Sequence, residues 1–183
     1  MLPAMSAALP HFPYHPDPVS TGAVVARKIT CLCCEQERDF VYTGPVYRAR
    51  VETEGRLCPW CIADGSAASR LGVDFGHTHD LMTAGIAREV IEAVELRTPG
   101  FFSWQNQSWL PHCDDACAFM GDASLEDVVE ASDETRETLK REYAMADDDW
   151  AHLIARYTPG GNPAFYEFVC RHCGFVRLGW DCT

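Results

Sequence analysis

The chain has 183 residues, 47% of them hydrophobic and 23% charged, with a formal net charge of −12 at pH 7. This composition excludes a disordered chain, and the length suits one domain or two small ones. No apolar run reaches the roughly 18–20 residues that cross a bilayer, and the acidic excess argues against a surface that binds nucleic acid directly.

Residues 1–21 form the first segment and contain prolines at positions 3, 10, 13, 16 and 18. Each proline fixes its own φ and disfavours the helical conformation in the residue before it. No Lys or Arg precedes a hydrophobic run, as it would in a secretory signal. We therefore expect an extended N-terminal arm and a cytoplasmic protein.

Residues 22–58 are rich in strand-forming residues. The run GAVVARKIT (22–30) predicts a strand that leads into CLCC (31–34). The following DFVYTGPVYRARVE (39–52) is broken by Gly44 and Pro45, which are typical of turns. We expect a β-hairpin between Cys34 and Cys58.

Residues 59–112 are predicted to be mainly helical. IADGSAASRLG (62–72) indicates a short helix that ends at Gly72, and MTAGIAREVIEAVELR (82–97) has the apolar spacing of an amphipathic helix. The aromatic run FFSWQNQSWLPHC (101–113) follows. We expect Trp104 and Trp109 to pack in the core, although exposed Trp side chains could instead anchor an interface.

The segment from Cys113 to Trp150 is strongly acidic, with thirteen Asp and Glu residues against three Lys and Arg, a local net charge of −10. Helices are predicted from Ser124 as N-cap, over 135–145, and from the three aspartates at 147–149. The simplest interpretation is a solvated helical face. The sharper one is a surface for a basic protein partner.

The chain closes with NPAFYEFVCRHCGFVRLGWDC (162–182), in which two β-type runs flank a C-x-x-C. We therefore predict an α+β fold of small, zinc-ribbon-like β-hairpins with an inserted helical region. Residues 22–183 would form a single domain with two cysteine-rich regions, 31–61 and 113–173.

Two C-x-x-C pairs, Cys31/Cys34 and Cys58/Cys61, lie 23 residues apart. In a reducing compartment ten cysteines are better interpreted as thiolate ligands than as disulfides, and two such pairs supply the four ligands of a structural zinc site. Cys33 is the spare thiol and could replace Cys31 or Cys34. The alternatives are a redox pair at Cys58 and Cys61, or cysteines that act independently.

A second zinc site is predicted from Cys113 and Cys117, spaced as on one helical turn, with Cys170 and Cys173. His112 or His172 could replace one of these cysteines. Sites with four protein ligands keep no position for water, so both zinc ions would be structural. We assign no role to Cys182.

An enzyme is the main alternative class. It would use Cys58 and Cys61 as a thiol pair, or His77 and His79 as metal ligands. The sequence shows no nucleophile, base and orienting group in one set, and no phosphate or dinucleotide fingerprint. We therefore predict no catalytic residues and favour a binding protein.

Several strings together resemble the CbrC family, a bacterial group whose name records tolerance to colicins. They are FPYHPDPVSTG (12–22), CLCCEQERDFVYTGPVY (31–47), LCPWCIADGSAA (57–68), RTPGFFSWQNQSWLPHC (97–113) and FVCRHCG (168–174). The resemblance implies no catalytic residue. It carries over only the paired cysteines, which are 31/34, 58/61, 113/117 and 170/173.

The interpretation that follows is a zinc-stabilised protein-interaction module of unknown activity. A second alternative is an acidic inhibitor of a basic nuclease, because some colicins kill with basic nuclease domains. Electrostatic steering would then act through exposed carboxylates. The candidates are Asp122, Glu126, Asp127, Glu130, Asp133 and Glu134.

Overall fold

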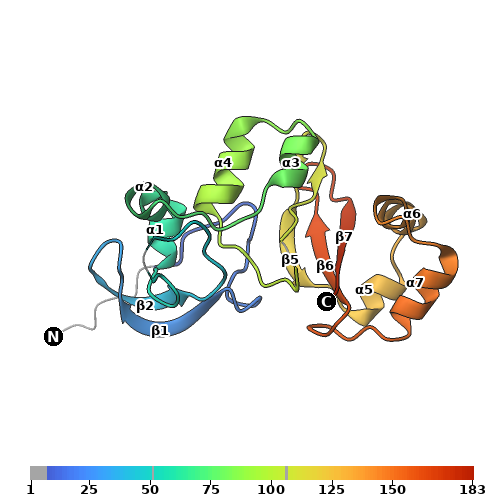
Figure 1. The fold of residues 1–183 in the computed structure, drawn as a ribbon, viewed down its shortest axis with the longest axis horizontal. Coiled ribbons are helices and arrows are strands. Elements are labelled where there is room, and N and C mark those ends of the chain that lie inside the picture. The colour runs from blue at the N-terminus through green and yellow to red at the C-terminus, as the bar shows by residue number, and fades with distance from the viewer. Residues whose placement is uncertain (1–7, 51, 106) are drawn as a thin grey trace.

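The computed structural model describes residues 8–50, 52–105 and 107–183, so the part of the N-terminal arm predicted over 1–7 lies outside the described residues. The described chain forms short helices and three small antiparallel sheets (Figure 1). In chain order the elements are β1 Val24–Thr30, β2 Glu37–Tyr42, α1 Pro59–Ala63, α2 Ser66–Leu71, α3 His79–Thr83, α4 Arg88–Arg97, β3 Pro111–His112, β4 Asp115–Ala116, β5 Ala118–Asp122, α5 Leu125–Val129, α6 Asp133–Glu142, α7 Asp147–Ile154, β6 Ala164–Val169 and β7 Val176–Asp181. The α+β prediction is confirmed.

The first hairpin pairs β1 with β2, and its last residue pair is Thr30 and Glu37. The predicted hairpin between Cys34 and Cys58 is wrong, because the C-x-x-C itself is the turn that reverses the chain. After β2 the chain forms a loop that returns to Tyr42 through a bridge with Leu57. This bridge brings the second cysteine pair beside the first.

The C-terminal sheet has the order β5-β6-β7. Its β6–β7 hairpin is likewise joined by a C-x-x-C, with Val169 opposite Val176. The predicted pattern of strand, C-x-x-C and strand is therefore present at both ends of the described chain.

The predicted helices are found with shifted boundaries. The segment 82–97 divides between α3 and α4 because Gly85, with φ of +71°, separates them. Ser124 caps α5 as expected, by accepting a hydrogen bond from the Asp127 amide. Helices α5, α6 and α7 lie together beside the β5–β7 sheet (Figure 1).

Three apolar clusters fill the interior. One surrounds the first cysteine pairs, one packs Trp109 and Phe168 between α4 and the β5–β7 sheet, and one joins the opposite face of that sheet to the helical insert. No helix in the described ranges is long and apolar enough to cross a membrane.

Candidate metal centres

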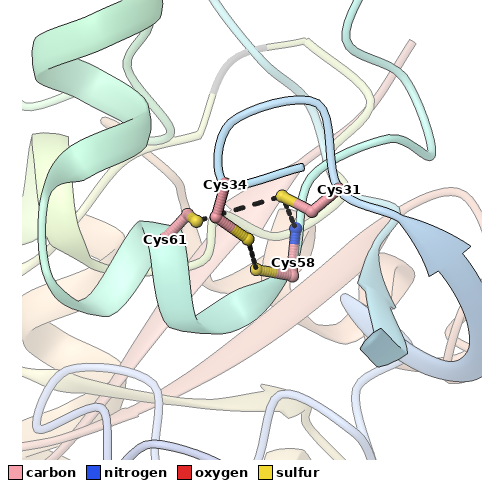
Figure 2. A group of neighbouring side chains, drawn as sticks. All are labelled: Cys31, Cys34, Cys58 and Cys61. Atoms are coloured by element: carbon pink, nitrogen blue, oxygen red, sulfur yellow. Dashed lines mark hydrogen bonds between the residues drawn. The ribbon is translucent and has the colours of Figure 1, made fainter. Parts of the chain in front are cut away.

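The first candidate centre contains Cys31, Cys34, Cys58 and Cys61. Cys31 follows the last residue of β1, and the turn closes when its amide donates to Gln36 and its carbonyl accepts from the Glu35 amide, at 2.9 and 2.8 Å. Cys58 is the N-cap of α1 and Cys61 lies one turn into that helix. A tight turn and a helix N-terminus thus each present two thiols (Figure 2).

The four sulfur atoms have the spacing of a tetrahedral metal site. The Sγ atoms of Cys31 and Cys61 are 3.9 Å apart and those of Cys34 and Cys58 are 4.0 Å apart. A tetrahedron with metal–sulfur bonds of ~2.3 Å has edges of roughly 3.8 Å, whereas a disulfide bond is ~2.05 Å. All ten cysteines are free. The geometry therefore fits thiolate ligands and not cystine.

Burial and hydrogen bonding divide the thiols of this centre. Cys31, Cys58 and Cys61 are at most 2% exposed. A hydrogen bond with the Cys58 thiol, helped by backbone amides, lowers the pKa of Cys31 to about 4, while the pKa of Cys58 is raised by the same contact. Burial raises the pKa of Cys61 to about 12. Because adjacent thiolates repel one another, all four thiols of this group would ionise together only around a bound cation.

The second candidate centre contains His112, Cys113, Cys170 and Cys173. Cys113 and Asp114 form the two-residue turn between β3 and β4, with φ of +50° and +56°, as in a type I′ hairpin turn. Cys170 and Cys173 lie in the β6–β7 turn, where Gly174 has φ of +75°. Two hairpin tips therefore face one another.

The donor atoms of this centre are also close together. The Sγ atoms of Cys113 and Cys173 are 3.8 Å apart, and the Nδ1 atom of His112 lies 3.2 and 3.4 Å from them. Although burial opposes it, hydrogen bonds from backbone amides lower the pKa of Cys170 to about 6. Unlike the first centre, this one is accessible, because Cys113 and Cys173 are exposed.

The fourth member of this group is His112 rather than Cys117. The helical turn expected to align Cys113 with Cys117 does not form, because residues 111–116 make the β3–β4 hairpin. Cys117 is fully buried in the apolar cluster around Trp109, and burial raises its pKa to about 12. The only sequence signal for His112 as a ligand was its position next to Cys113. By the same criterion His172, next to Cys173, was an equally good candidate.

A buried carboxylate beside the second centre was missed by sequence reasoning. Asp115 accepts hydrogen bonds from the Tyr14 hydroxyl and the Arg171 guanidinium, and it pairs with His172 Nε2, each at 2.9 Å. The Arg171 guanidinium also lies 4.6 Å from the centre of the Tyr14 ring. Arg171 and His172, the two residues between Cys170 and Cys173, therefore both contact Asp115. His172 faces this carboxylate and not the cysteines.

The remaining candidates lie outside both groups. Cys33 is buried and its thiol donates to Ser66 Oγ at 3.5 Å, while Cys182 is partly exposed near the end of the chain. The rings of His77 and His79 are 6.4 Å apart, and neither belongs to the two donor groups found among the described residues.

The two tryptophans of the aromatic run 101–113 differ in exposure. Trp109 is fully buried, as predicted, whereas Trp104 is 49% exposed. Trp104 therefore belongs to the surface and not to the packing around the second centre.

The fold and the two donor groups define a mixed α+β protein with small antiparallel sheets and two four-membered Cys/His groups that could hold metal ions. Each group is assembled from a strand–C-x-x-C–strand hairpin and a second pair of donor residues. The chain belongs to the family described as "Uncharacterised protein family (UPF0167)", which matches residues 9–182.

Among similar proteins, the UPF0167 protein PA1536 of Pseudomonas aeruginosa is 45% identical over 179 residues, covering 98% of this chain and all of that protein. The UPF0167 proteins Mb2317 of Mycobacterium bovis and MT2352 of Mycobacterium tuberculosis are each 43% identical over 175 residues, covering 94% of this chain and 92% of theirs. No solved structure matches the chain.

Proposed function

We propose that the protein is a zinc-stabilised protein-interaction module of the bacterial cytoplasm. The observation that carries the proposal is that both donor groups have four ligand atoms within 4.8 Å of one another. Thiolate and imidazole donors in a four-membered set are those that zinc prefers, and four protein ligands leave no position for a reactive water. The metals would hold the fold together.

The distribution of charge supports a basic protein as the partner. Of the thirteen acidic residues between Cys113 and Trp150, only Asp115 is buried. Most of the others lie on the three short helices α5, α6 and α7 (Figure 1), whereas Asp114 lies in the β3–β4 turn and Asp122 ends β5. Such a surface attracts a basic partner at long range, with association that weakens as salt rises.

Metal content and folding test this proposal together. Elemental analysis of the purified protein should give two zinc ions per chain, and a strong chelator should remove them with loss of the circular dichroism of the folded state. Cys58→Ser should lower the zinc content by one. Cys33→Ser is the matched control, because it removes a buried thiol outside the donor groups and should leave two ions. A metal-free protein with unchanged structure would refute the proposal.

The acidic insert also supports a second candidate function, the inhibition of a basic nuclease. The motif resemblance to the CbrC family, with its link to colicin tolerance, is the reason to consider it. The test mixes the protein with a basic nuclease domain at low salt and measures binding and cleavage.

The variant for this test combines Glu126→Gln, Glu130→Gln and Glu134→Gln, three exposed side chains. It spares Asp127, whose carboxylate caps α5 by accepting from the Ser124 amide. Loss of inhibition in the triple variant is the expected result. Equal behaviour of both proteins, or no binding by either, would eliminate this function.

A further inference from the structure

A cavity of about 270 Å³ opens where the loop that carries Phe102 and Trp104 meets the ends of β5 and β6. Tyr166, Asp122 and the Gly160–Gly161 turn line its other sides. Sites for whole small molecules usually measure ~300–1,000 Å³. This volume is therefore better suited to a single side chain than to a complete metabolite.

Three aromatic side chains line the cavity. Phe102 is 61% exposed and Trp104 is 49% exposed, although both are large apolar residues. Tyr166 is buried and forms the part of the lining nearest the core. Exposed aromatic rings around a cavity are typical of recognition sites. Because much of their surface stays in water, these two rings contribute little to the stability of the fold.

Trp104 is held in position despite its exposure. Its indole Nε1 donates to the Gly161 carbonyl at 2.8 Å, and its backbone amide donates to Asp181 Oδ2 at 2.6 Å. The Gln105 amide donates to the same carboxylate oxygen at 3.0 Å. An exposed ring that is held by its indole N–H, on a backbone that is itself anchored to Asp181, is preorganised, which reduces the entropy lost when a ligand packs against it.

The charged group of the cavity is Asp122. It is the last residue of β5 and lies directly opposite Tyr166 on β6, so the carboxylate and the phenol share one face of the sheet. The Asp122 side chain remains accessible to solvent, although the surrounding chain partly desolvates its carboxylate and so raises its pKa. No described side chain forms a hydrogen bond or ion pair with this carboxylate. A ligand with N–H donors would supply the missing partner.

We propose that this cavity binds the guanidinium group of an arginine side chain presented by a partner protein. The planar cation would pack against the exposed rings of Phe102 and Trp104, while Asp122 accepts its N–H donors. Arginine suits the site better than lysine because its guanidinium is planar, less strongly hydrated and able to bind a carboxylate through two donors. The inference rests on the proposed function, since it gives a binding chemistry to the interaction module.

The test uses the zinc-loaded protein and a capped Gly-Arg-Gly peptide, with binding followed through the indole N–H signals in NMR spectra. The Trp104 signal is identified by its absence in Trp104→Phe. The arginine peptide should shift this signal saturably. The peptide with citrulline, which has the same shape without the charge, and the peptide with lysine should each bind at least fivefold more weakly.

Two matched variants separate the cavity from the general charge of the surface. Asp122→Asn should weaken binding roughly tenfold, as expected when a charge-assisted contact is lost. Glu130→Gln makes the same change in net charge at an exposed position of the acidic segment that does not line the cavity, and should bind like the unmodified protein. Zinc content and circular dichroism of both variants establish that they are folded.

The inference is overturned if Glu130→Gln weakens binding as much as Asp122→Asn, if the citrulline or lysine peptide binds equally well, or if the folded protein binds no peptide. Tighter binding of free arginine than of the capped peptide would also overturn it, because the source would then be a metabolite and not a protein. A protein that binds the peptide but contains no zinc would refute the proposed role of the metal while leaving the cavity assignment intact.

Discussion

Glu35 and Gly174 occupy equivalent positions, each directly after the second cysteine of a C-x-x-C turn. Their φ values are +58° and +75°, in the left-handed region. In both turns the amide of this residue donates to the carbonyl of the first cysteine, at 2.8 Å for Glu35 and 3.0 Å for Gly174. The turn therefore requires the left-handed conformation whatever residue occupies the position.

Glu35→Gly should consequently stabilise the protein. A non-glycine residue in the left-handed region costs ~1–2 kcal/mol, part of which glycine loses again through its greater freedom in the unfolded chain. We expect a net gain of about 1 kcal/mol in the free energy of unfolding, measured by urea denaturation with zinc present. Gly174→Ala should instead lower the free energy of unfolding. A Cβ atom at this position would meet no neighbouring atom, so the substitution adds only backbone strain. Equal stability of all three proteins would contradict this interpretation of the turn.

Substitutions at His112 and Cys117 should separate ligand from core residue. His112→Ala removes a donor from the second group, so the zinc content should fall from two ions to one. Cys117→Ala removes one buried atom, and we expect a loss of about 1 kcal/mol in stability with both ions retained. Elemental analysis after gel filtration gives the zinc content. If His112→Ala keeps two zinc ions and Cys117→Ala keeps only one, Cys117 and not His112 is the ligand.

At the scale of elements, the two centres differ in what covers them. The first is enclosed by its own apolar cluster, which includes Phe12, Leu57 and Phe75. The second lies between the tips of two hairpins, where the described chain provides less cover and two of its cysteines are exposed. Accessibility therefore follows from the element that carries each ligand, although the ligand chemistry is similar.

Thiol alkylation of the native protein should follow this difference. We expect N-ethylmaleimide to modify Cys113 and Cys173 at least tenfold faster than the cysteines of the first centre, because reaction requires access to the sulfur. Peptide mapping by mass spectrometry at successive times measures the order, and partly exposed Cys182 serves as an internal reference outside both groups. Early reaction of Cys58 or Cys61 would instead support the thiol-enzyme alternative.

At the scale of the whole molecule, residues 8–21 connect the parts of the fold. Phe12 packs in the cluster around the first centre, whereas Tyr14 packs in the cluster of Trp109 and hydrogen-bonds Asp115 beside the second centre. His15 is fully buried between them, with Nδ1 2.8 Å from the Pro99 carbonyl and Nε2 2.7 Å from Thr21 Oγ1. This part of the predicted arm is therefore packed against both halves.

His15 should make the stability of the protein depend on pH. Burial lowers its pKa from 6.5 to about 4, so between these values the unfolded chain binds a proton that the folded protein does not. The contribution of His15 is fully present above pH 6.5 and is lost as the pH falls toward 4, a total of about 3 kcal/mol.

The variant His15→Gln retains one donor and one acceptor but does not titrate. Its free energy of unfolding, measured in urea at pH 7, 6 and 5 with excess zinc, should fall less steeply than that of the unmodified protein. The difference between the two proteins isolates His15, because both donor groups are the same in the two proteins. Parallel pH profiles would show that this histidine does not control the effect.

Local sequence patterns were sufficient to predict part of this protein. The C-x-x-C pairs, the strands on either side of them, the Ser124 cap and the end of a helix at Gly72 all depend on residues within a few positions of one another. Spacing and side-chain chemistry decide such features before any distant contact forms. The sequence by itself therefore determined the α+β class and the first donor group.

Only the tertiary structure decided the rest, because distant segments had to be brought together. Whether His112 or Cys117 completes the second group depends on how the β3–β4 hairpin faces a turn about sixty residues later. The contacts of Tyr14 with Asp115 and of Trp104 with the Gly160–Gly161 turn likewise join segments far apart in the chain. No periodicity or spacing encodes these pairs. Packing of the sheet and its connecting loops selects them, since each side chain's neighbours are known only once the backbone has folded.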